Sequence, residues 1–420
     1  MPVDIISTII FDGTDAIPGW RYIKTAAPAL AAIGATKYYF GGTTNTWERE
    51  LHGKVYIITG GTSGVGAHLA YELATKGAQI ILLVRSIEDS WTVEYVDDLR
   101  ERTNNFMIYA EECDLASLYS VRKFATRWLD NQPPRRLDGV ICCAAETLPL
   151  GKGKQLTVDG VERQIGINYL GHYHLLTLLS PSLRVQPPDR DVRVLIANCS
   201  SHLLGDVNVK DLLWENTPYP RYQPYKVYGT SKLLLGMFCK EFQREHDRYE
   251  RKDKHRCNIR VNMVNPGIMR SASTRRFLSM GSLFGLLVYL VMYPIWWLLL
   301  KSSYQGSQSF LFAVAAPIIP KIEGGNLIQE CKIVTKTRKE YGDEELQKEV
   351  FATTEKLIAA LEKQSAVNRK KQEKKLKSQK KEADLSRKPE TVDELESKLD
   401  KLRREIAIPR SSEALFPETK

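Results

Sequence analysis

The sequence predicts an α/β fold in which one open, doubly wound parallel sheet carries helices on both faces. Three observations predict it: short runs rich in Val and Ile recur along the chain, each run is continuously apolar rather than alternating, and the intervals between runs are long enough for crossover helices. Continuous apolar runs are typical of strands covered on both sides. The candidate strands are residues 55–59, 80–84, 106–113, 139–143, 192–197 and 259–264, with 326–334 as a candidate last strand.

Composition agrees with a folded soluble protein. Hydrophobic residues make up 43% and charged residues 26% of the 420 residues, which excludes a fully disordered, a collagen-like and a polytopic membrane chain. The net charge is +10, but residues 369–388 hold ten Lys or Arg against three acidic residues. Most of the basicity therefore belongs to a tail, and no nucleic-acid partner is indicated. The seven scattered cysteines form no CxxC pair or Cys/His ladder, so neither a metal site nor a disulfide framework is expected.

The chain divides into an N-terminal arm (1–50), one large domain (51–362) and a charged helical or disordered tail (363–420). The arm is expected to be loosely attached, with a membrane-surface contact as the alternative, because residues 26–35 are too short and too Ala-rich to span a bilayer. In the tail, Leu395, Leu399 and Leu402 are spaced for at most two heptads, which is too few for a coiled coil. The tail is either solvated or attached to anionic lipid.

The most hydrophobic window is 283–300, which contains no charge. As one helix it would measure about 27 Å against a hydrocarbon core of about 30 Å. A single crossing, however, would put the candidate strand 326–334 on the wrong side of the membrane, and Pro294 interrupts the window. We therefore predict a lid or a monotopic membrane anchor over residues 277–301, with a buried helix and a true span as alternatives.

A glycine-rich turn, Thr59-Gly60-Gly61-Thr62-Ser63-Gly64-Val65-Gly66, follows the first strand and opens a helix. In a strand–turn–helix context such a turn lets the backbone approach a pyrophosphate at the helix N-terminus, which indicates a dinucleotide site of the Rossmann type. Arg85 and Ser86 end the second strand, where an acidic residue would accept a ribose 2′-hydroxyl. A cation there suits a 2′-phosphate and favours NADP, with a solvent-facing Arg85 as the alternative. Asp114 is placed to meet the adenine edge.

Tyr228 and Lys232 are spaced i and i+4, so a helix would place them on one face. A free tyrosine has a pKa near 10, and a neighbouring cation lowers it. Ser200 and Ser201 follow a predicted central strand, where a hydroxyl could polarise a substrate carbonyl.

Taken in order, these residues resemble the short-chain dehydrogenase/reductase family, specifically its retinol-dehydrogenase-like branch and fungal-type membrane- or lipid-droplet-associated members, over roughly residues 51–362. The matches are the glycine turn, Asp114-Leu115, Asn168-Tyr169-Leu170-Gly171-His172, Ser200-Ser201, Asp211-Leu212-Leu213-Trp214, Tyr228–Lys232, Asn265-Pro266-Gly267, Gly306-Ser307-Gln308 and Glu330-Cys331.

The resemblance implies a catalytic tetrad. Tyr228 would exchange the proton, Lys232 would favour the phenolate and bind the nicotinamide ribose, Ser201 would hydrogen-bond the reacting oxygen, and Asn168 would hold a water that links Lys232 to solvent. The cofactor-binding residues would be Gly60, Thr62, Ser63, Gly64, Val65, Gly66, Arg85, Asp114, Tyr228, Lys232, Pro266 and Ile268. One departure is Cys142-Cys143-Ala144-Ala145, where the family usually has Asn-Asn-Ala-Gly. We interpret these cysteines as small buried hydrophobes, with a redox switch as the alternative. His172 and His174 are assigned to packing.

The expected activity is NADP(H)-dependent interconversion of a carbonyl and an alcohol on a lipophilic substrate, such as a retinoid, steroid, fatty aldehyde or keto-lipid. The alternative is a membrane- or lipid-droplet-associated scaffold with a largely non-catalytic domain. The expected location is the cytosol-facing surface of the endoplasmic reticulum or a lipid droplet, reached through residues 277–301 and the basic tail. A homodimer is compatible with the sequence.

Overall fold

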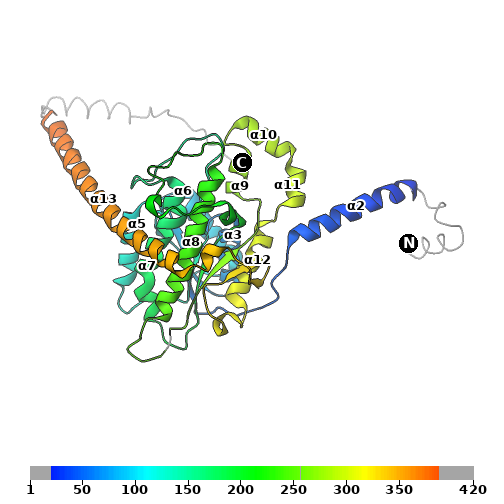
Figure 1. The fold of residues 1–420 in the computed structure, drawn as a ribbon, viewed down its shortest axis with the longest axis horizontal. Coiled ribbons are helices and arrows are strands. Elements are labelled where there is room, and N and C mark those ends of the chain that lie inside the picture. Colours follow the sequence, from blue (N-terminus) through cyan, green and yellow to red (C-terminus); the bar gives the residue numbers. More distant parts are fainter. Residues whose placement is uncertain (1–19, 256, 387–420) are drawn as a thin grey trace, which may run out of the picture. The chain divides into compact units, whose positions relative to one another are not determined.

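The computed structural model describes residues 20–255 and 257–386, and its fold is the predicted doubly wound α/β sheet (Figure 1). The eight strands lie in the order β3-β2-β1-β4-β5-β6-β7-β8. Neighbours are parallel, except that β7 and β8 pair antiparallel. The strands are β1 (Val55–Thr59), β2 (Gln79–Val84), β3 (Ile108–Glu112), β4 (Gly139–Cys142), β5 (Val192–Ala197), β6 (Ile259–Asn265), β7 (Leu327–Gln329) and β8 (Lys332–Val334).

Helices cover both faces of this sheet and bury a hydrophobic core on each. Successive side chains of one strand enter opposite cores: Ile57 belongs to the core with α5, α7, α8 and α13, and Ile58 to the core with α3, α4 and α12. This two-sided burial explains why the strands read as continuous apolar runs. The helices are α2 (Trp20–Gly41), α3 (Gly64–Thr75), α4 (Ser90–Thr103), α5 (Leu118–Leu129), α6 (Arg163–Ile165), α7 (Gly171–Arg184), α8 (Pro224–Asp247), α9 (Ala272–Leu278), α10 (Leu283–Val291), α11 (Tyr293–Leu299), α12 (Ser303–Ala315) and α13 (Glu344–Ser386).

The apolar window 283–300 is two short helices, α10 and α11, which meet at Met292. Pro294 occupies the first turn of α11, where proline is tolerated because an N–H at that position has no partner within the helix. Among the residues that the structure describes, no helix is both long enough and apolar enough to cross a membrane.

The chain separates into two compact units, residues 1–362 and 363–420. The expected arm contains α2, whereas residues 1–19 lie outside the described part. In the tail, α13 is described as far as Ser386, so the leucine spacing at Leu395, Leu399 and Leu402 also lies outside it.

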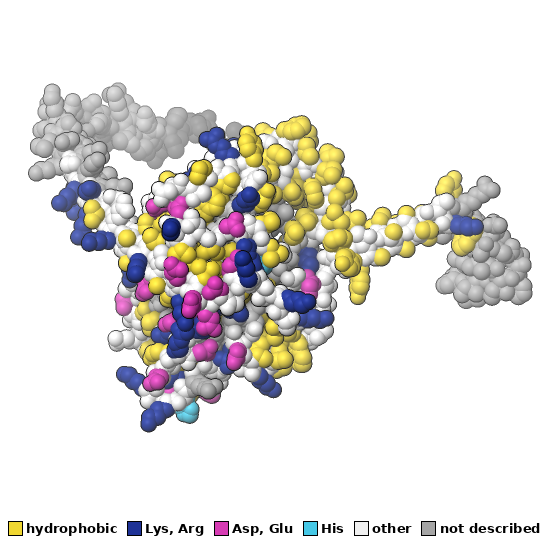
Figure 2. All heavy atoms as spheres, viewed as in Figure 1, with side chains coloured by type: hydrophobic (Ala, Val, Ile, Leu, Met, Phe, Trp, Pro, Cys, Tyr) yellow, Lys and Arg dark blue, Asp and Glu magenta, His cyan; other side chains and the backbone are white. Residues whose placement is uncertain are grey.

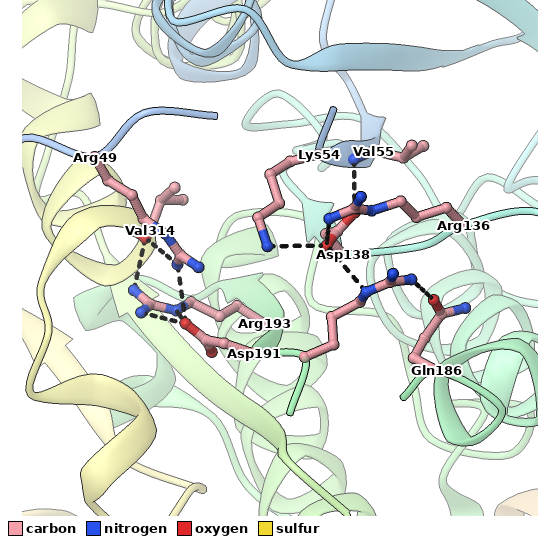
Figure 3. A network of polar contacts seen from close by, with 10 residues as sticks. Arg49, Lys54, Val55, Arg136, Asp138, Gln186, Asp191, Arg193 and Val314 are labelled. Carbon is pink, nitrogen blue, oxygen red and sulfur yellow. Dashed lines mark hydrogen bonds and ion pairs between the residues drawn. The ribbon is translucent and has the colours of Figure 1, made fainter. Parts of the chain in front are cut away.

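A network of ion pairs joins the amino ends of the central strands (Figure 3). The side chain of Asp138, just before β4, is 1% exposed and accepts from Arg136 Nε (2.6 Å) and from the Val55 N–H at the start of β1 (2.9 Å). Lys54 Nζ and Arg190 Nε lie 3.3 and 3.8 Å from its other oxygen. Three cations therefore share one buried carboxylate, at the opposite end of the strands from the candidate site.

Candidate active site

The predicted site residues gather in one cavity at the carboxyl ends of the strands. The strand order reverses between β1 and β4, and in open α/β sheets ligands bind at this switch point. The cavity has a volume of about 820 Å³. Its walls include every predicted site residue except Asn168, namely Gly60, Thr62, Ser63, Gly64, Val65, Gly66, Arg85, Asp114, Ser201, Tyr228, Lys232, Pro266 and Ile268.

The glycine turn needs its glycines for two physical reasons. Gly60 and Gly64 have φ of +65° and +58°, a backbone conformation that favours glycine. Gly66 is packed so closely that a Cβ atom would lie 2.2 Å from the carbonyl oxygen of Gly60. The turn therefore brings bare backbone to the cavity wall at the start of α3, where unpaired N–H groups suit an anionic pyrophosphate.

Arg85 and Asp114 lie where the sequence places them, at the ends of β2 and β3. Arg85 is exposed at the cavity wall, and within residues 20–255 and 257–386 no acidic side chain forms an ion pair with it. The Asp114 carboxylate accepts from the Ala116 N–H (3.0 Å), and the Asp114 N–H donates to Ser120 Oγ (3.0 Å). Asp114 is thus fixed in position, whereas the Arg85 guanidinium remains available to a ligand anion.

Tyr228 and Lys232 share one face of α8, as their spacing predicts. Lys232 is buried, its Nζ donates to the carbonyl oxygen of Ala197 (2.9 Å), and this nitrogen lies 5.8 Å from the centre of the Tyr228 ring. Ser201 lies in the 3-10 helix Ser200–Leu204 after β5, with its Oγ 2.6 Å from Cys199 Sγ. Hydroxyl, phenol and ammonium groups thus converge on the same cavity.

The protonation of Tyr228 differs from the expectation based on Lys232 alone. Burial raises the pKa of Tyr228 well above its ordinary value, the neighbouring Cys199 raises it further, and a hydrogen bond with Thr147 opposes them. Burial also lowers the pKa of Lys232. Desolvation changes the pKa of each group more than the closeness of the two groups on one helix face does, so Tyr228 keeps its proton at neutral pH.

Asn168 lies behind the cavity wall in a π-helical turn, Gly166–Leu170, that precedes α7. Its Oδ1 accepts from the Glu146 N–H (2.7 Å), and its Nδ2 donates to the Glu146 carbonyl (3.0 Å) and to Ser231 Oγ (3.1 Å). The side chain therefore ties the segment after β4 to α8 next to Lys232.

His172, which we assigned to packing, is part of a directed chain of hydrogen bonds. The Ala144 N–H donates to Thr59 Oγ1 (3.1 Å), Thr59 Oγ1 lies 3.0 Å from His172 Nε2, and His172 Nδ1 lies 3.1 Å from the Asn168 carbonyl. Because an N–H only donates and a carbonyl only accepts, the proton of the neutral imidazole must be on Nδ1. The chain connects the glycine turn, the end of β4 and the turn that holds Asn168.

This series of hydrogen bonds lies beside the altered Cys142–Ala145 segment. Cys142 is buried in the core, and Cys143 lines the cavity. Burial raises the pKa of the Cys143 thiol to about 12, so it stays protonated near neutral pH. That state supports the interpretation of this cysteine as a small apolar residue rather than a reactive thiol.

We expect His172 to make the fold sensitive to mild acid. Burial, and then the charge of Lys232, lower the pKa of His172 to about 4, against about 6.5 in an unfolded chain. A lowered folded pKa means that the unfolded chain binds the proton first, so stability is lost as the pH falls from about 6.5 to about 4. Between pH 7 and 5 the loss should be about 2 kcal/mol. The free energy of unfolding of His172→Asn, measured at both pH values, should fall by about 2 kcal/mol less than that of the natural protein. An equal fall in both proteins would contradict this assignment.

Sequence reasoning missed several residues around the reacting centre. Cys199 and Thr147 both contact Tyr228, and Leu204, Tyr225 and Phe277 line the same cavity. Cys199 was within reach of the sequence, because it directly precedes Ser200 and Ser201. Phe277 is the first residue of the segment that we predicted as a lid or anchor, whereas Thr147 had no local signal, since its proximity to Tyr228 depends on how distant loops meet.

Comparisons with known proteins can now be set beside this geometry. Residues 54–204 match the family described as short chain dehydrogenase. An uncharacterized oxidoreductase of Saccharomyces cerevisiae is 45% identical over 384 residues, which cover 86% of this chain and 93% of that protein. Human retinol dehydrogenase 13 is 32% identical over 304 residues, 70% of this chain and 82% of that protein. Among solved structures, a protein of Mycobacterium paratuberculosis has a TM-score of 0.54 at 24% identity, with 76% of this chain and 98% of that chain covered, and it shares the fold.

Proposed function

Because the chain belongs to the short-chain dehydrogenase/reductase family, in its retinol-dehydrogenase-like branch, and is a carbonyl–alcohol oxidoreductase, we propose that it reduces a lipophilic carbonyl compound with NADPH. One observation carries the proposal. The glycine turn, Arg85 and the Ser201–Tyr228–Lys232 group all line one cavity of about 820 Å³, so the expected dinucleotide-binding residues and the expected catalytic residues face the same space.

The residues present fit a nicotinamide dinucleotide. Gly60, Gly64 and Gly66 leave the backbone bare at the N-terminus of α3, and the Arg85 guanidinium stands at the cavity wall without a recorded acidic partner in the described ranges. A bidentate guanidinium recognises a phosphate better than a hydroxyl, which supports NADP over NAD. Asp114 would meet the adenine edge, and Pro266 and Ile268 would border the nicotinamide end.

The chemistry at the other end follows from the tetrad. The bound cofactor supplies a hydride to the carbonyl carbon. Tyr228, which burial keeps protonated, donates its proton to the carbonyl oxygen, while Ser201 Oγ donates a hydrogen bond to the same oxygen. Lys232 then stabilises the tyrosinate and would hold the nicotinamide ribose, and Asn168 would hold the water through which a proton returns to Tyr228.

The apolar part of the cavity wall supports a lipophilic substrate. Leu204, Tyr225, Met269 and Phe277 are among the residues that line the cavity. Retinol dehydrogenase 13, a relative at 32% identity, is named for an apolar alcohol. Retinoids, fatty aldehydes, steroids and keto-lipids remain the proposed class.

The assay that tests this function follows NADPH oxidation by the purified full chain. The panel should include a long-chain aldehyde, retinaldehyde and a steroid ketone, with a short hydrophilic aldehyde as the comparison. Turnover with at least one lipophilic member is expected. Failure with the whole panel would favour the alternative of a scaffold with a non-catalytic domain.

Arg85→Asp should weaken NADP binding much more than NAD binding. A hydrogen bond between charged groups contributes about 1.5–3 kcal/mol, so the Kd for NADP should rise by about 10- to 100-fold. Titration of both cofactors by quenching of protein fluorescence measures the two changes. Arg102→Asp, at an exposed arginine in the last turn of α4, is the control and should leave both constants unchanged. An equal loss for NAD and NADP would refute the role given to Arg85.

We also propose that residues 277–301 and the basic tail attach the protein to the cytosol-facing surface of the endoplasmic reticulum or a lipid droplet. The support from the structure is the exposure of α10, where Leu283 and Phe284 are 88% and 77% exposed. Large apolar side chains at this exposure mark interaction sites when they are contiguous.

A further inference from the structure

Two segments far apart in the sequence, α2 and α9–α11, lie together and expose apolar side chains (Figure 2). Helix α2 packs on α11, where Lys37 Nζ donates to the carbonyl oxygen of Trp297 (2.5 Å) and lies 4.9 Å from the centre of its ring. The exposed large apolar residues of the two segments are Tyr22, Leu30, Ile33, Tyr38, Tyr39, Phe40, Met280, Leu283, Phe284, Leu287, Val288, Leu290, Val291, Tyr293, Ile295, Trp297 and Leu299. We call this set the apolar platform.

The two segments that carry the apolar platform contain basic residues and no acidic ones. The sequence has no Asp or Glu between residues 16 and 47 or between 266 and 322. Lys24 and Arg275 are exposed within these ranges, and Arg276 is exposed but pairs with Glu146 (3.3 Å). Lys37 lies at the contact between α2 and α11, and Arg270 donates to the hydroxyl of Tyr293 (3.1 Å). Apolar side chains next to an excess of cations are the composition that binds an anionic lipid surface.

The exposure of α2 indicates lipid rather than a protein partner. Residues 24–35 are all exposed, which is more than three helical turns with no covered face. A flat protein surface would cover one narrow face of such a helix, whereas a leaflet takes up the apolar side chains of an interfacial helix to a depth of about 5–10 Å. Tyr38, Tyr39, Tyr293 and Trp297 have the amphipathic rings that are enriched at membrane interfaces.

The apolar platform is also next to the cavity. Helix α9 lines the cavity with Ala272, Ser273, Thr274 and Phe277, and four residues separate the end of α9 from the start of α10. Contact of α10 with lipid would therefore bring the cavity wall formed by α9 to the leaflet. A lipophilic substrate dissolved in that leaflet would reach the cavity without crossing water.

We propose that α2 and α9–α11 form one two-part platform that lies in the surface of an anionic phospholipid leaflet and admits the substrate from that leaflet beside α9. This adds α2 to the membrane contacts of the proposed function, which are residues 277–301 and the basic tail, and it places the cavity wall formed by α9 at the leaflet. Binding to lipid stands independently of the proposed chemistry, whereas the route of the substrate rests on it.

The first test is flotation of the purified full chain with vesicles, without cofactor or substrate. The vesicles are phosphatidylcholine alone or phosphatidylcholine mixed with phosphatidylserine. The natural protein should float with both, and more with phosphatidylserine. The pairs L30D/I33D on α2 and L283D/L287D on α10 should each lower the bound fraction about tenfold, and K24E/R275E should weaken the preference for phosphatidylserine, of which the basic tail keeps a part.

The matched control pair is F106D/V185D. Phe106 and Val185 are 73% and 57% exposed and lie before β3 and after α7, away from the carboxyl ends of the strands. This pair should float like the natural protein, and the thermal midpoints of all variants should agree, because every substituted side chain is exposed. Equal flotation of platform and control variants would overturn the proposal. So would a lipid-free dimer, seen by sedimentation, that L283D/L287D dissociates and that does not float.

The second test separates the route of the substrate from the chemistry. L283D/L287D should keep turnover of a short soluble aldehyde and lose about tenfold in turnover of a long-chain aldehyde supplied in vesicles. Loss of both activities equally would refute entry from the leaflet. Absence of turnover in the natural protein would instead refute the proposed function and leave the flotation result standing.

Discussion

Tyr228→Phe is expected to lower kcat by about 10²- to 10⁴-fold, because general acid catalysis by a positioned side chain contributes that range. The substitution removes one hydroxyl and keeps the ring on α8. In this structure the hydroxyl contacts Cys199 and Thr147 and faces the cavity that Ser201 and the glycine turn also line. The Kd for NADPH should change little, since the cofactor contacts proposed for Gly60, Gly64 and Arg85 remain. The measurements are steady-state kcat and an independent titration of NADPH.

Tyr225→Phe is the matched control for this variant. Tyr225 lies one helical turn before Tyr228 on α8 and lines the same cavity, so its loss tests the effect of removing a phenolic hydroxyl without the proposed proton donor. Its kcat should remain within a few-fold of the natural value. A similar loss of kcat in both variants would show that removing a phenolic hydroxyl from the cavity wall lowers turnover by itself, without any specific role for the proton of Tyr228. Unchanged turnover in Tyr228→Phe would rule out the tetrad mechanism.

The sheet could be predicted from the sequence because both of its faces are buried. Five of the expected strands end within one residue of β1, β2, β4, β5 and β6, since a continuous apolar run has the same limits as the strand. The expected strand 326–334 is a hairpin of β7 and β8, because Glu330 and Cys331 take left-handed conformations with φ of 51° and 54°. Helix α2 could not be predicted from apolar periodicity, because residues 24–35 are all exposed and no face of this helix is buried against a core.

The candidate site was predictable where it depends on strand ends and helix spacing. Tyr228 and Lys232 meet because α8 places them one turn apart, and the glycine turn and Ser201 meet because parallel strands bring their carboxyl ends to one edge. What the sequence could not show is desolvation, which keeps Tyr228 protonated despite Lys232. The hydrogen bond from Thr59 to His172 joins residues 113 positions apart, and no local pattern predicts such a contact.

Asp138→Asn is expected to destabilise the fold by about 1.5–3 kcal/mol, because it removes the charge from hydrogen bonds whose cationic partners are partly exposed and stay hydrated. The side chain of Asp138 is 1% exposed and is shared by Lys54, Arg136 and Arg190 (Figure 3). Asparagine keeps the shape and the acceptor for the Val55 N–H, so the loss measures charge rather than packing. The free energy of unfolding from urea titration is the quantity to compare. Asp97→Asn is the control, since Asp97 is 63% exposed in its pair with Arg100 and such pairs contribute about 0–1 kcal/mol.

The pH dependence of this variant distinguishes lost charge from a distorted backbone. Burial alone would raise the pKa of Asp138, but the hydrogen bonds from Arg136 and Val55 and the charge of Lys54 lower it below its ordinary value. A lowered folded pKa means that the stabilisation is complete above the unfolded pKa of about 3.9 and is lost as the pH falls through the folded pKa. The difference in unfolding free energy between the natural protein and Asp138→Asn should therefore be largest at neutral pH and shrink below about pH 4. His172 titrates in both proteins and cancels in this difference. A difference that stays constant down to pH 3 would mean that the asparagine disturbs the start of β1 or β4 instead of leaving three cations without their carboxylate.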